Sequence, residues 1–306
     1  MRPLRASSLL IATTVVLAGL AGCTGTAASD RPQIVVTTNI LGDVVENLTG
    51  DTAEVTILMK PNADPHSFEI SAQEAARMDG ADLLVTNGLG LEEGLQQHID
   101  RTAAAGVPTV VAGDVIDVLP YSSEDANGAD DPHFWTDPAR MVDVVDAVEE
   151  ALAEVDGIDV AQVRSNAETY RGELAELDEE ISATFAAIPV ERRALVTNHH
   201  VFGYLADRFD FRLIGAVIPG GTTLAAPSAA DLRDLTDAID EAGVRTIFAE
   251  SSQPDRLIQV LASEADVQVE VIELFTESLT EPGEGADTYL TMMRANTDRI
   301  ADGLTP

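Results

Sequence analysis

The sequence predicts an α/β protein with two lobes, each built on a mostly parallel sheet, joined by one long rigid helix. Apolar, β-rich runs alternate with helical patterns over residues 33–113, a second alternating set follows residue 190, and one long amphipathic segment separates the two sets. Alternation of this kind indicates parallel strands whose faces are covered by helices. We therefore expect an N-terminal lobe over 33–157, a linking helix over 158–189 and a C-terminal lobe over 190–306.

The N-terminal set contains four expected strands and three expected helices. The strands are QIVVTT (33–38), AEVTILM (53–59), DLLVTN (82–87) and VPTVVAG (107–113), all apolar and rich in β-branched residues. The helices are ILGDVVENLTG (40–50), SAQEAARMDG (71–80) and LEEGLQQHID (91–100), and glycine ends the first two. A further helix begins at TDPAR (136–140).

The linking helix is expected over VAQVRSNAETYRGELAELDEEISATFAAI (160–188). Its apolar residues recur every three or four positions, from Val163 through Tyr170 to Ile181, so that one face is apolar. At 1.5 Å per residue the helix would be roughly 43 Å long, enough to pack across both lobes. A free coiled coil is the alternative, but no second segment with this pattern exists to pair with it.

The C-terminal set repeats the alternation. Its expected strands are RALVTN (193–198), FRLIGAVI (211–218), VRTIFAE (244–250) and VQVEVIEL (267–274). Its expected helices lie near 201–208, 228–242, 254–265 and 286–302.

Composition limits the partners and the chemistry. Of the 306 residues 45% are apolar, which is enough for one large or two medium cores. The formal net charge of −35 repels polyanions, so we expect no nucleic-acid partner. The sequence contains neither an HExxH nor a GxSxG motif, and its one cysteine lies near the N-terminus. These observations argue against an enzyme.

The first residues have the order of an export signal. Arg2 and Arg5 precede an apolar run, Leu9–Leu20, that is too short to span a membrane. Cys23 closes LAGC, a tetrapeptide similar to the bacterial lipobox, in which the cysteine is lipidated and becomes the first residue. We therefore expect a signal peptide over 1–22, then a lipidated Cys23 and a polar tether to residue 32. Cleavage near TAAS (26–29), with loss of Cys23, is the alternative, and both imply export.

Four of the five histidines lie in loops or at junctions between strands and helices. His66 follows the second expected strand, His133 follows a long acidic loop, and His199 and His200 follow a strand directly. Ligands of open α/β sheets bind outside the carboxyl ends of the strands, so these sites, from both lobes, are expected to converge on the cleft between the lobes. Imidazole nitrogens with a carboxylate suit zinc and similar metals. His98 lies in a polar helix and is expected to be exposed.

Several segments together resemble one protein family. NADPHSFE (62–69), DPHFWTDP (131–138), TNHHVFGYLADRF (197–209) and FAESSQPDRLIQVLASE (248–264), with the segment from LFTES (274–278) onward, are similar to the zinc- and manganese-binding receptors of bacterial ABC importers, the ZnuA/TroA-like family. The resemblance covers nearly all of the chain after the leader, in the same order. It implies two α/β lobes joined by a rigid helix, with the metal between them.

The resemblance also implies a set of ligands. The family's first histidine corresponds to His66, its second to His133 and its third to His199, while His200 stands where the family usually has aspartate. The fourth ligand, normally an aspartate before a serine, corresponds to Glu277, which is one methylene longer. Glu250 in FAESS is the reserve carboxylate, and we expect both Glu250 and His200 to lie behind the ligands as supporting or reserve residues.

Three imidazoles and one carboxylate complete a four-coordinate shell that suits Zn²⁺, whereas Mn²⁺ prefers more oxygen. A closed shell leaves no position for an activated water. We therefore expect a monomeric, high-affinity Zn²⁺ receptor, lipid-anchored at the outer face of the cytoplasmic membrane of a bacterium, that delivers metal to an ABC permease. A manganese receptor, a surface adhesin with a structural metal and a secreted zinc hydrolase are the alternatives.

Overall fold

Two parallel four-stranded sheets organise the chain, as the sequence predicts. The computed structural model describes residues 31–122, 126, 128–252, 256–264 and 269–305. The expected leader over 1–22 and Cys23 lie outside the described residues. The first sheet has the order β2-β1-β3-β4 and the second β6-β5-β7-β8, and every described strand pair is parallel. The predicted α/β class with mostly parallel sheets is confirmed.

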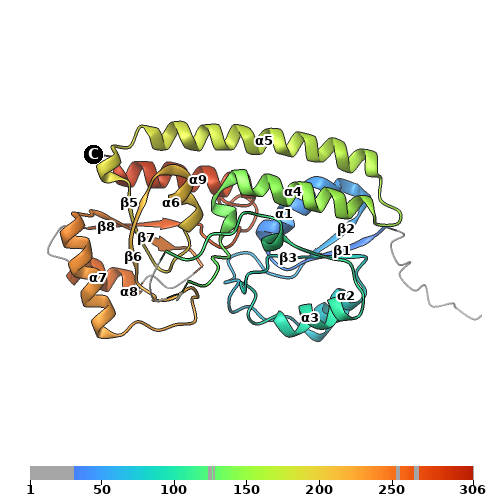
Figure 1. The fold of residues 1–306 in the computed structure, drawn as a ribbon, viewed down its shortest axis with the longest axis horizontal. Coiled ribbons are helices and arrows are strands. Elements are labelled where there is room, and N and C mark those ends of the chain that lie inside the picture. The colour runs from blue at the N-terminus through green and yellow to red at the C-terminus, as the bar shows by residue number, and fades with distance from the viewer. Residues whose placement is uncertain (1–30, 123–125, 127, 253–255, 265–268, 306) are drawn as a thin grey trace, which may run out of the picture. The chain divides into compact units, whose positions relative to one another are not determined.

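The N-terminal lobe alternates strands and helices in the expected order (Figure 1). Threonine, serine and aspartate begin three of its helices: Thr38 caps α1, Ser71 forms a capping box with Glu74 at α2, and Asp137 caps α4. The elements are β1 (Gln33–Val36), α1 (Asn39–Thr49), β2 (Glu54–Ile57), α2 (Ala72–Asp79), β3 (Leu83–Thr86), α3 (Gln96–Ala104), β4 (Thr109–Val111) and α4 (Pro138–Ala153).

One N-terminal helix begins later than the sequence predicts. The helix expected over 91–100 begins at Gln96, because the preceding residues form turns around a buried acid. Glu92 accepts hydrogen bonds from the backbone N–H groups of Asn87 (2.7 Å) and Gly88 (3.1 Å) and from the Thr37 hydroxyl (2.7 Å). A side chain held inward in this way ties the loop to the sheet.

The C-terminal lobe repeats the pattern, and three of its four strands have five residues. Strands β7 and β8 pair over five residues, from Thr246 opposite Glu270 to Glu250 opposite Leu274. The elements are β5 (Ala194–Thr197), α6 (Gly203–Phe209), β6 (Arg212–Ala216), α7 (Ala229–Ala242), β7 (Thr246–Glu250), α8 (Arg256–Glu264), β8 (Glu270–Leu274) and α9 (Tyr289–Leu304).

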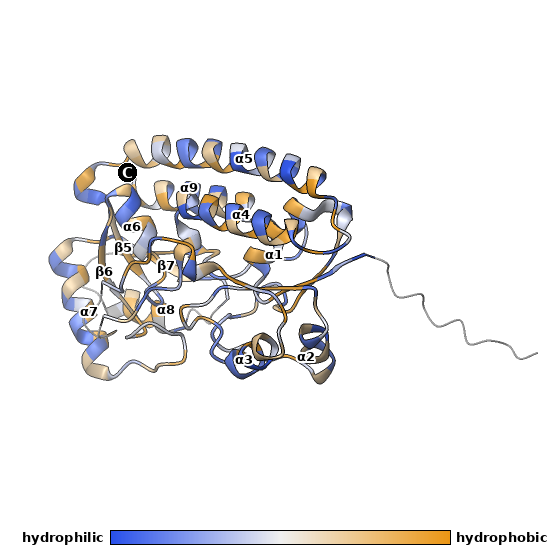
Figure 2. Ribbon diagram, turned by 45° about the vertical axis from the view of Figure 1, so that its right-hand side comes forward, coloured by the Kyte–Doolittle hydropathy of each residue, from blue (hydrophilic) through white to orange (hydrophobic). Residues whose placement is uncertain are grey.

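The long helix α5 (Val160–Ala186) packs against elements of both lobes. It contacts α1 and α4 of the N-terminal lobe and α9 of the C-terminal lobe (Figure 1). Its buried residues recur every three or four positions: Val163, Ala167, Tyr170, Leu174, Leu177, Ile181 and Phe185. Figure 2 shows the matching alternation of hydrophobic and hydrophilic residues along the ribbon. These contacts exclude the free coiled coil.

The core under α5 is shared by the two lobes. One continuous cluster of buried apolar side chains includes Val36 and Val145 from the N-terminal lobe, Leu177 from α5, and Phe248 and Ile300 from the C-terminal lobe. Two smaller clusters fill the outer faces of the sheets, one beneath α2 and α3 and the other beneath α7 and α8. Among the described residues no helix is long and apolar enough to span a bilayer.

Candidate metal centre

Four side chains from both lobes meet in one buried cluster. His66, His133, His199 and Glu277 each offer a ligand atom, and these atoms lie within 4.8 Å of one another. The four residues are at most 2% exposed. Each residue lies in a segment that follows the carboxyl end of a strand. Parallel sheets bind ligands beyond these ends.

A turn built around Asp64 holds His66. The Asp64 carboxylate accepts hydrogen bonds from the backbone N–H of His66 (2.9 Å) and from the hydroxyl of Ser67 (3.0 Å). The backbone N–H of Phe68 donates to the Asp64 carbonyl at 3.0 Å. This local turn aims the His66 ring inward, although its Nδ1 is buried with no hydrogen-bond partner among the described residues.

The His133 ring is oriented by a carboxylate two residues before it. Asp131 accepts from both the backbone N–H of His133 (2.9 Å) and its ring Nδ1 (2.7 Å). The ring packs edge-on against Trp135, with centroids 5.2 Å apart. In a neutral ring whose Nδ1 donates its proton to Asp131, Nε2 has no proton, and its lone pair is directed at the cluster.

Glu250 supports His199 in the same manner. The Glu250 carboxylate accepts from His199 Nδ1 and, at 3.3 Å, from its backbone N–H. The side-chain oxygen of Asn198 in turn accepts from the backbone N–H of Glu250 at 3.0 Å. Glu250 therefore holds the ring through its Nδ1 side, and it is not one of the four clustered residues.

The Glu277 carboxylate faces all three imidazoles. Its Oε1 lies 3.0 Å from Nε2 of His66, 3.3 Å from Nε2 of His133 and 3.2 Å from Nε2 of His199. Neither oxygen of Glu277 has a hydrogen-bond partner among the described backbone and hydroxyl groups. A buried carboxylate that meets only imidazole nitrogens is a poor structural residue and a good cation ligand.

Charges inside the cluster balance one another through large pKa shifts. Burial would raise the pKa of Glu277, but the attraction of His199 and the other two imidazoles outweighs it and holds that pKa well below its usual value. Burial would lower the pKa of His199, but Glu250 and Glu277 raise it well above the usual value. The pKa of His133 is also raised, because Asp131 outweighs its burial. The raised pKa values of His133 and His199 mean that a metal competes with protons for these two rings.

The remaining sequence-predicted residues lie elsewhere. His200 is half-buried and is not one of the four clustered residues. His98 is half-buried rather than exposed, and its ring Nδ1 lies 3.1 Å from the Arg101 guanidinium. Sequence reasoning missed Asp131, although an acid two positions before a histidine is near enough in the chain to accept a hydrogen bond from that histidine's ring.

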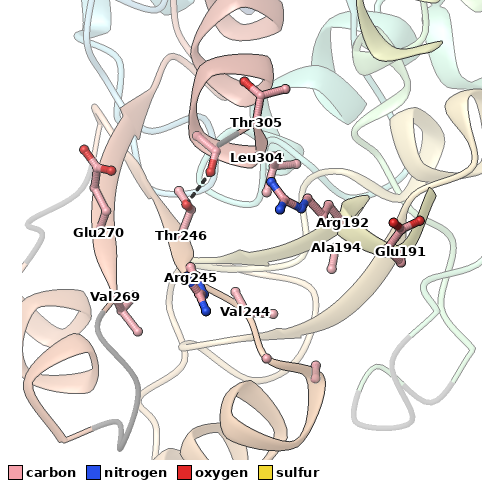
Figure 3. A pocket seen from close by; sticks show the side chains of 13 residues that line it. Glu191, Arg192, Ala194, Val244, Arg245, Thr246, Val269, Glu270, Leu304 and Thr305 are labelled. Carbon is pink, nitrogen blue, oxygen red and sulfur yellow. Dashed lines mark hydrogen bonds between the residues drawn. The ribbon is translucent and has the colours of Figure 1, made fainter. Parts of the chain in front are cut away.

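A hollow lies at the amino-terminal ends of the strands in the C-terminal sheet. It has a volume of about 1060 Å³ and is lined by the starts of β5, β7 and β8 and the end of α9 (Figure 3). Its polar lining includes Arg192, Arg245, Glu191 and Glu270, and none of the four clustered residues takes part. The volume of a hollow therefore does not identify the candidate metal site in this fold.

Comparison with known proteins supports a metal-related role. Residues 34–303 match the family model ZnuA, described as "Zinc-uptake complex component A periplasmic". The chain is 29% identical to the manganese-binding lipoprotein MntA of Halalkalibacterium halodurans, over 97% of this chain and 98% of the relative. It is 28% identical to the zinc-binding protein TroA of Treponema pallidum, over 92% of each chain. The solved structure of that periplasmic zinc-binding protein superposes with a TM-score of 0.83, covering 90% of this chain and all of the other.

Proposed function

This chain belongs to the ZnuA family of zinc-uptake components, and on that premise we propose that it is a high-affinity extracytoplasmic Zn²⁺ receptor that delivers its ion to an ABC permease. Whichever metal it binds, the chain is a metal-binding receptor of an ABC importer and not an enzyme. The metal is cargo, and the protein's chemistry is to bind and release it.

One observation carries the proposal for the site. Three Nε2 atoms and a carboxylate converge in a buried cluster whose ligand atoms lie within 4.8 Å of one another. We propose His66, His133, His199 and Glu277 as the ligands, with Glu250 behind His199 and no direct role for His200. Three neutral nitrogens and one oxygen form the closed tetrahedral set that Zn²⁺ prefers.

Manganese is the second candidate, and Glu277 is the observation that favours it. Both Glu277 oxygens are without other hydrogen-bond partners among the described residues, so the carboxylate can bind through both and bring the coordination number to five. Mn²⁺ prefers oxygen-rich shells with more ligands. The relative MntA is named as manganese-binding, whereas TroA is named as zinc-binding.

The test is elemental analysis joined to competition. The chain without residues 1–23 is purified, its bound metal is measured, and zinc and manganese then compete for the emptied site. We expect one Zn²⁺ per chain and loss of more than about 100-fold in zinc affinity for His66→Ala, His133→Ala and His199→Ala, since even supporting residues cost 10–100-fold. His98→Ala is the matched control and should bind normally. Manganese that outcompetes equimolar zinc would overturn the zinc assignment.

The location and partners belong to the same proposal. We propose a signal peptide over 1–22, a lipid on Cys23, a tether to residue 32, lobes over 33–157 and 190–306 with the linking helix between them, and a monomer at the outer face of the cytoplasmic membrane. The relatives named as lipoproteins support the anchor. Mass spectrometry of the full-length protein from bacterial membranes should find an acyl chain on Cys23, and a secreted product without it would contradict the anchor.

A further inference from the structure

The candidate metal centre is sealed from solvent. The side chains of His66, His133, His199 and Glu277 are at most 1% exposed. An ion of any kind must therefore move a covering segment aside before it can enter or leave. The question is which segment around the cluster moves most easily.

The loop that carries Glu277 is firmly attached to the N-terminal lobe. Asn39 donates to the Ser278 hydroxyl (2.9 Å) and accepts from the backbone N–H of Leu279 (3.0 Å). The backbone N–H of Asn62 donates to the Leu279 carbonyl (3.0 Å), and Trp135 Nε1 donates to the Thr276 carbonyl (2.8 Å). The residues of this loop from Leu274 to Thr280 are all buried. Opening of this loop would break several buried hydrogen bonds at once.

The 217–228 loop, which connects β6 to α7, is attached far more lightly. Val217 and Ile218 still bond to the end of β5, but the residues beyond them are half-buried or exposed, and Leu224 is 56% exposed. Among the residues that the structure describes, two side-chain hydrogen bonds join this loop to the N-terminal lobe. The Tyr121 hydroxyl donates to the Gly221 carbonyl, and the Thr223 hydroxyl donates to the Asp64 carboxylate at 2.7 Å. Segments with few buried contacts are the ones that open locally.

Both N-terminal partners of the 217–228 loop also adjoin a site histidine. Asp64 holds the backbone N–H of His66. The Tyr121 ring packs edge-on against the His133 ring with centroids 6.0 Å apart, and the residue before it, Pro120, forms an isolated antiparallel bridge with Asp130. The two bonds thus connect one C-terminal loop to the supports of both N-terminal histidines.

The contact between the loop and Tyr121 requires glycine. A Cβ at Gly221 would lie 2.6 Å from Cζ and 2.8 Å from the hydroxyl oxygen of Tyr121, closer than packed atoms approach. Tyr121 itself is buried, with 8% of its surface exposed. The ring fits against the loop backbone only because position 221 has no side chain.

We propose that the 217–228 loop is a latch over the metal centre, closed by the Tyr121–Gly221 and Thr223–Asp64 hydrogen bonds, and that its opening limits the rate at which metal enters and leaves. The inference rests on the proposed function and adds a means of control to the same site. Because neither bond involves a metal ligand, loosening the latch accelerates binding and release together and leaves the affinity nearly unchanged.

The test measures both rate constants with Zn²⁺ as the probe. Trp135 is the only tryptophan and its ring adjoins His133, so its fluorescence reports the ion in stopped-flow mixing with zinc and then with excess EDTA. Tyr121→Phe and Thr223→Val each remove one latch bond while Asp64 and the Tyr121 ring position are kept. We expect the association and dissociation rate constants to rise about fivefold in each variant and about 25-fold in the double variant, with the dissociation constant within twofold.

Thr222→Val is the matched control, because Thr222 accepts only from the backbone of Leu224 within the same loop in the described structure. It should leave both rate constants unchanged. Faster dissociation without faster association would show that Tyr121 and Thr223 merely position the histidines, and unchanged rates would also overturn the latch. Absence of zinc binding by the unaltered chain would overturn the proposed function and the latch together, whereas normal binding with unaltered variant rates would overturn the latch alone.

Discussion

Glu250 and Glu277 are two buried carboxylates of the candidate centre with different surroundings. Glu250 accepts hydrogen bonds from His199, and its pKa is raised by burial despite the opposing attraction of that histidine. Glu277 meets three imidazoles, and their attraction lowers its pKa in spite of equal burial. The first is placed to orient a ligand, and the second is placed to neutralise part of an ion's charge.

This contrast predicts unequal effects of matched amide substitutions. Glu250→Gln keeps an oxygen that accepts from His199 Nδ1, and we expect it to weaken zinc binding by about 10- to 100-fold, the usual cost of altering a supporting group. Glu277→Gln removes a charge in direct contact with the ion and should cost more than about 100-fold. Isothermal titration with zinc measures both. A normal isotherm for Glu277→Gln beside a weakened Glu250→Gln would move the fourth ligand to Glu250.

The raised pKa values of His133 and His199 predict the direction of the pH dependence of binding. Metal binds only neutral imidazole, so protons compete with it. Because both pKa values lie above the ordinary 6.5, competition begins above pH 6.5 rather than below it. Zinc affinity should fall as the pH drops from mildly alkaline to mildly acidic, and the fall should already be measurable above pH 6.5. Competition titrations at pH 8, 7 and 6 measure this, and an affinity that is constant across them would contradict the assigned histidines.

At the scale of elements, one buried acid joins helices of both lobes. Asp43 on α1 accepts from the backbone N–H of Tyr289 at the start of α9 (3.0 Å) and from the hydroxyl of Tyr170 on α5 (3.5 Å). Desolvation by burial raises the pKa of Asp43 to about 6, although these hydrogen bonds oppose the shift. The contact between α1, α5 and α9 therefore contains a carboxylate whose charge is costly to bury.

Asp43→Asn is expected to stabilise the fold at neutral pH. The folded-state pKa of about 6 exceeds the ordinary aspartate value of 3.8, so between these values the folded chain holds a proton that the unfolded chain lacks. Stability from this group is greatest below pH 3.8 and is lost as the pH rises through 6. The variant should gain up to about 3 kcal/mol at pH 7.5, and the gain should vanish near pH 4.

Urea unfolding of metal-free protein at the two pH values measures the difference. Asp51→Asn, at an exposed position just beyond α1, is the control and should change stability little at either pH. A gain for Asp43→Asn that is equal at both pH values would show that the effect does not come from the buried charge.

At the scale of the whole molecule, the shared core predicts that folding does not depend on the metal. The apolar cluster beneath α5 includes residues of both lobes and of α5 itself, so that the sheets are held together without help from the four site residues. A structural metal site in a small domain supplies the folding free energy outright, but a chain with a core of this extent does not need that contribution.

Removal of metal should therefore leave the protein folded. We expect circular dichroism to show unchanged helix content after EDTA treatment and a higher melting temperature when zinc is restored, since ligand at about 1,000 times its dissociation constant adds about 4 kcal/mol of stability. Unfolding on chelation would favour the adhesin alternative with a structural metal. Recovery of the original melting temperature on adding zinc is the check on reversibility.

Local pattern was sufficient to predict the elements and their order. The spacing of Val163, Tyr170 and Ile181 predicts α5, and capping residues such as Asp137 mark helix starts, because backbone conformation responds to neighbours in the sequence. The start of α3 was the exception: Glu92 turns inward to the ends of β1 and β3, a contact that no local pattern contains. The expected signal peptide and the expected lipid on Cys23 are inferred from the order of the first residues alone, and these residues lie outside the part of the chain that the structure describes.

The sequence by itself thus predicted the α/β class, the long helix and a short list of candidate metal ligands. Only the tertiary structure decided how they meet: His66 and His133 are 67 residues apart, His133 and His199 are 66 apart, and their Nε2 atoms lie 3.4 and 3.3 Å from each other. It also decided that Glu277 rather than Glu250 faces the three rings, and that Tyr121 reaches Gly221. The physical reason is that side-chain convergence depends on how two sheets pack beneath one helix, and that packing is a sum of contacts between segments distant in the chain.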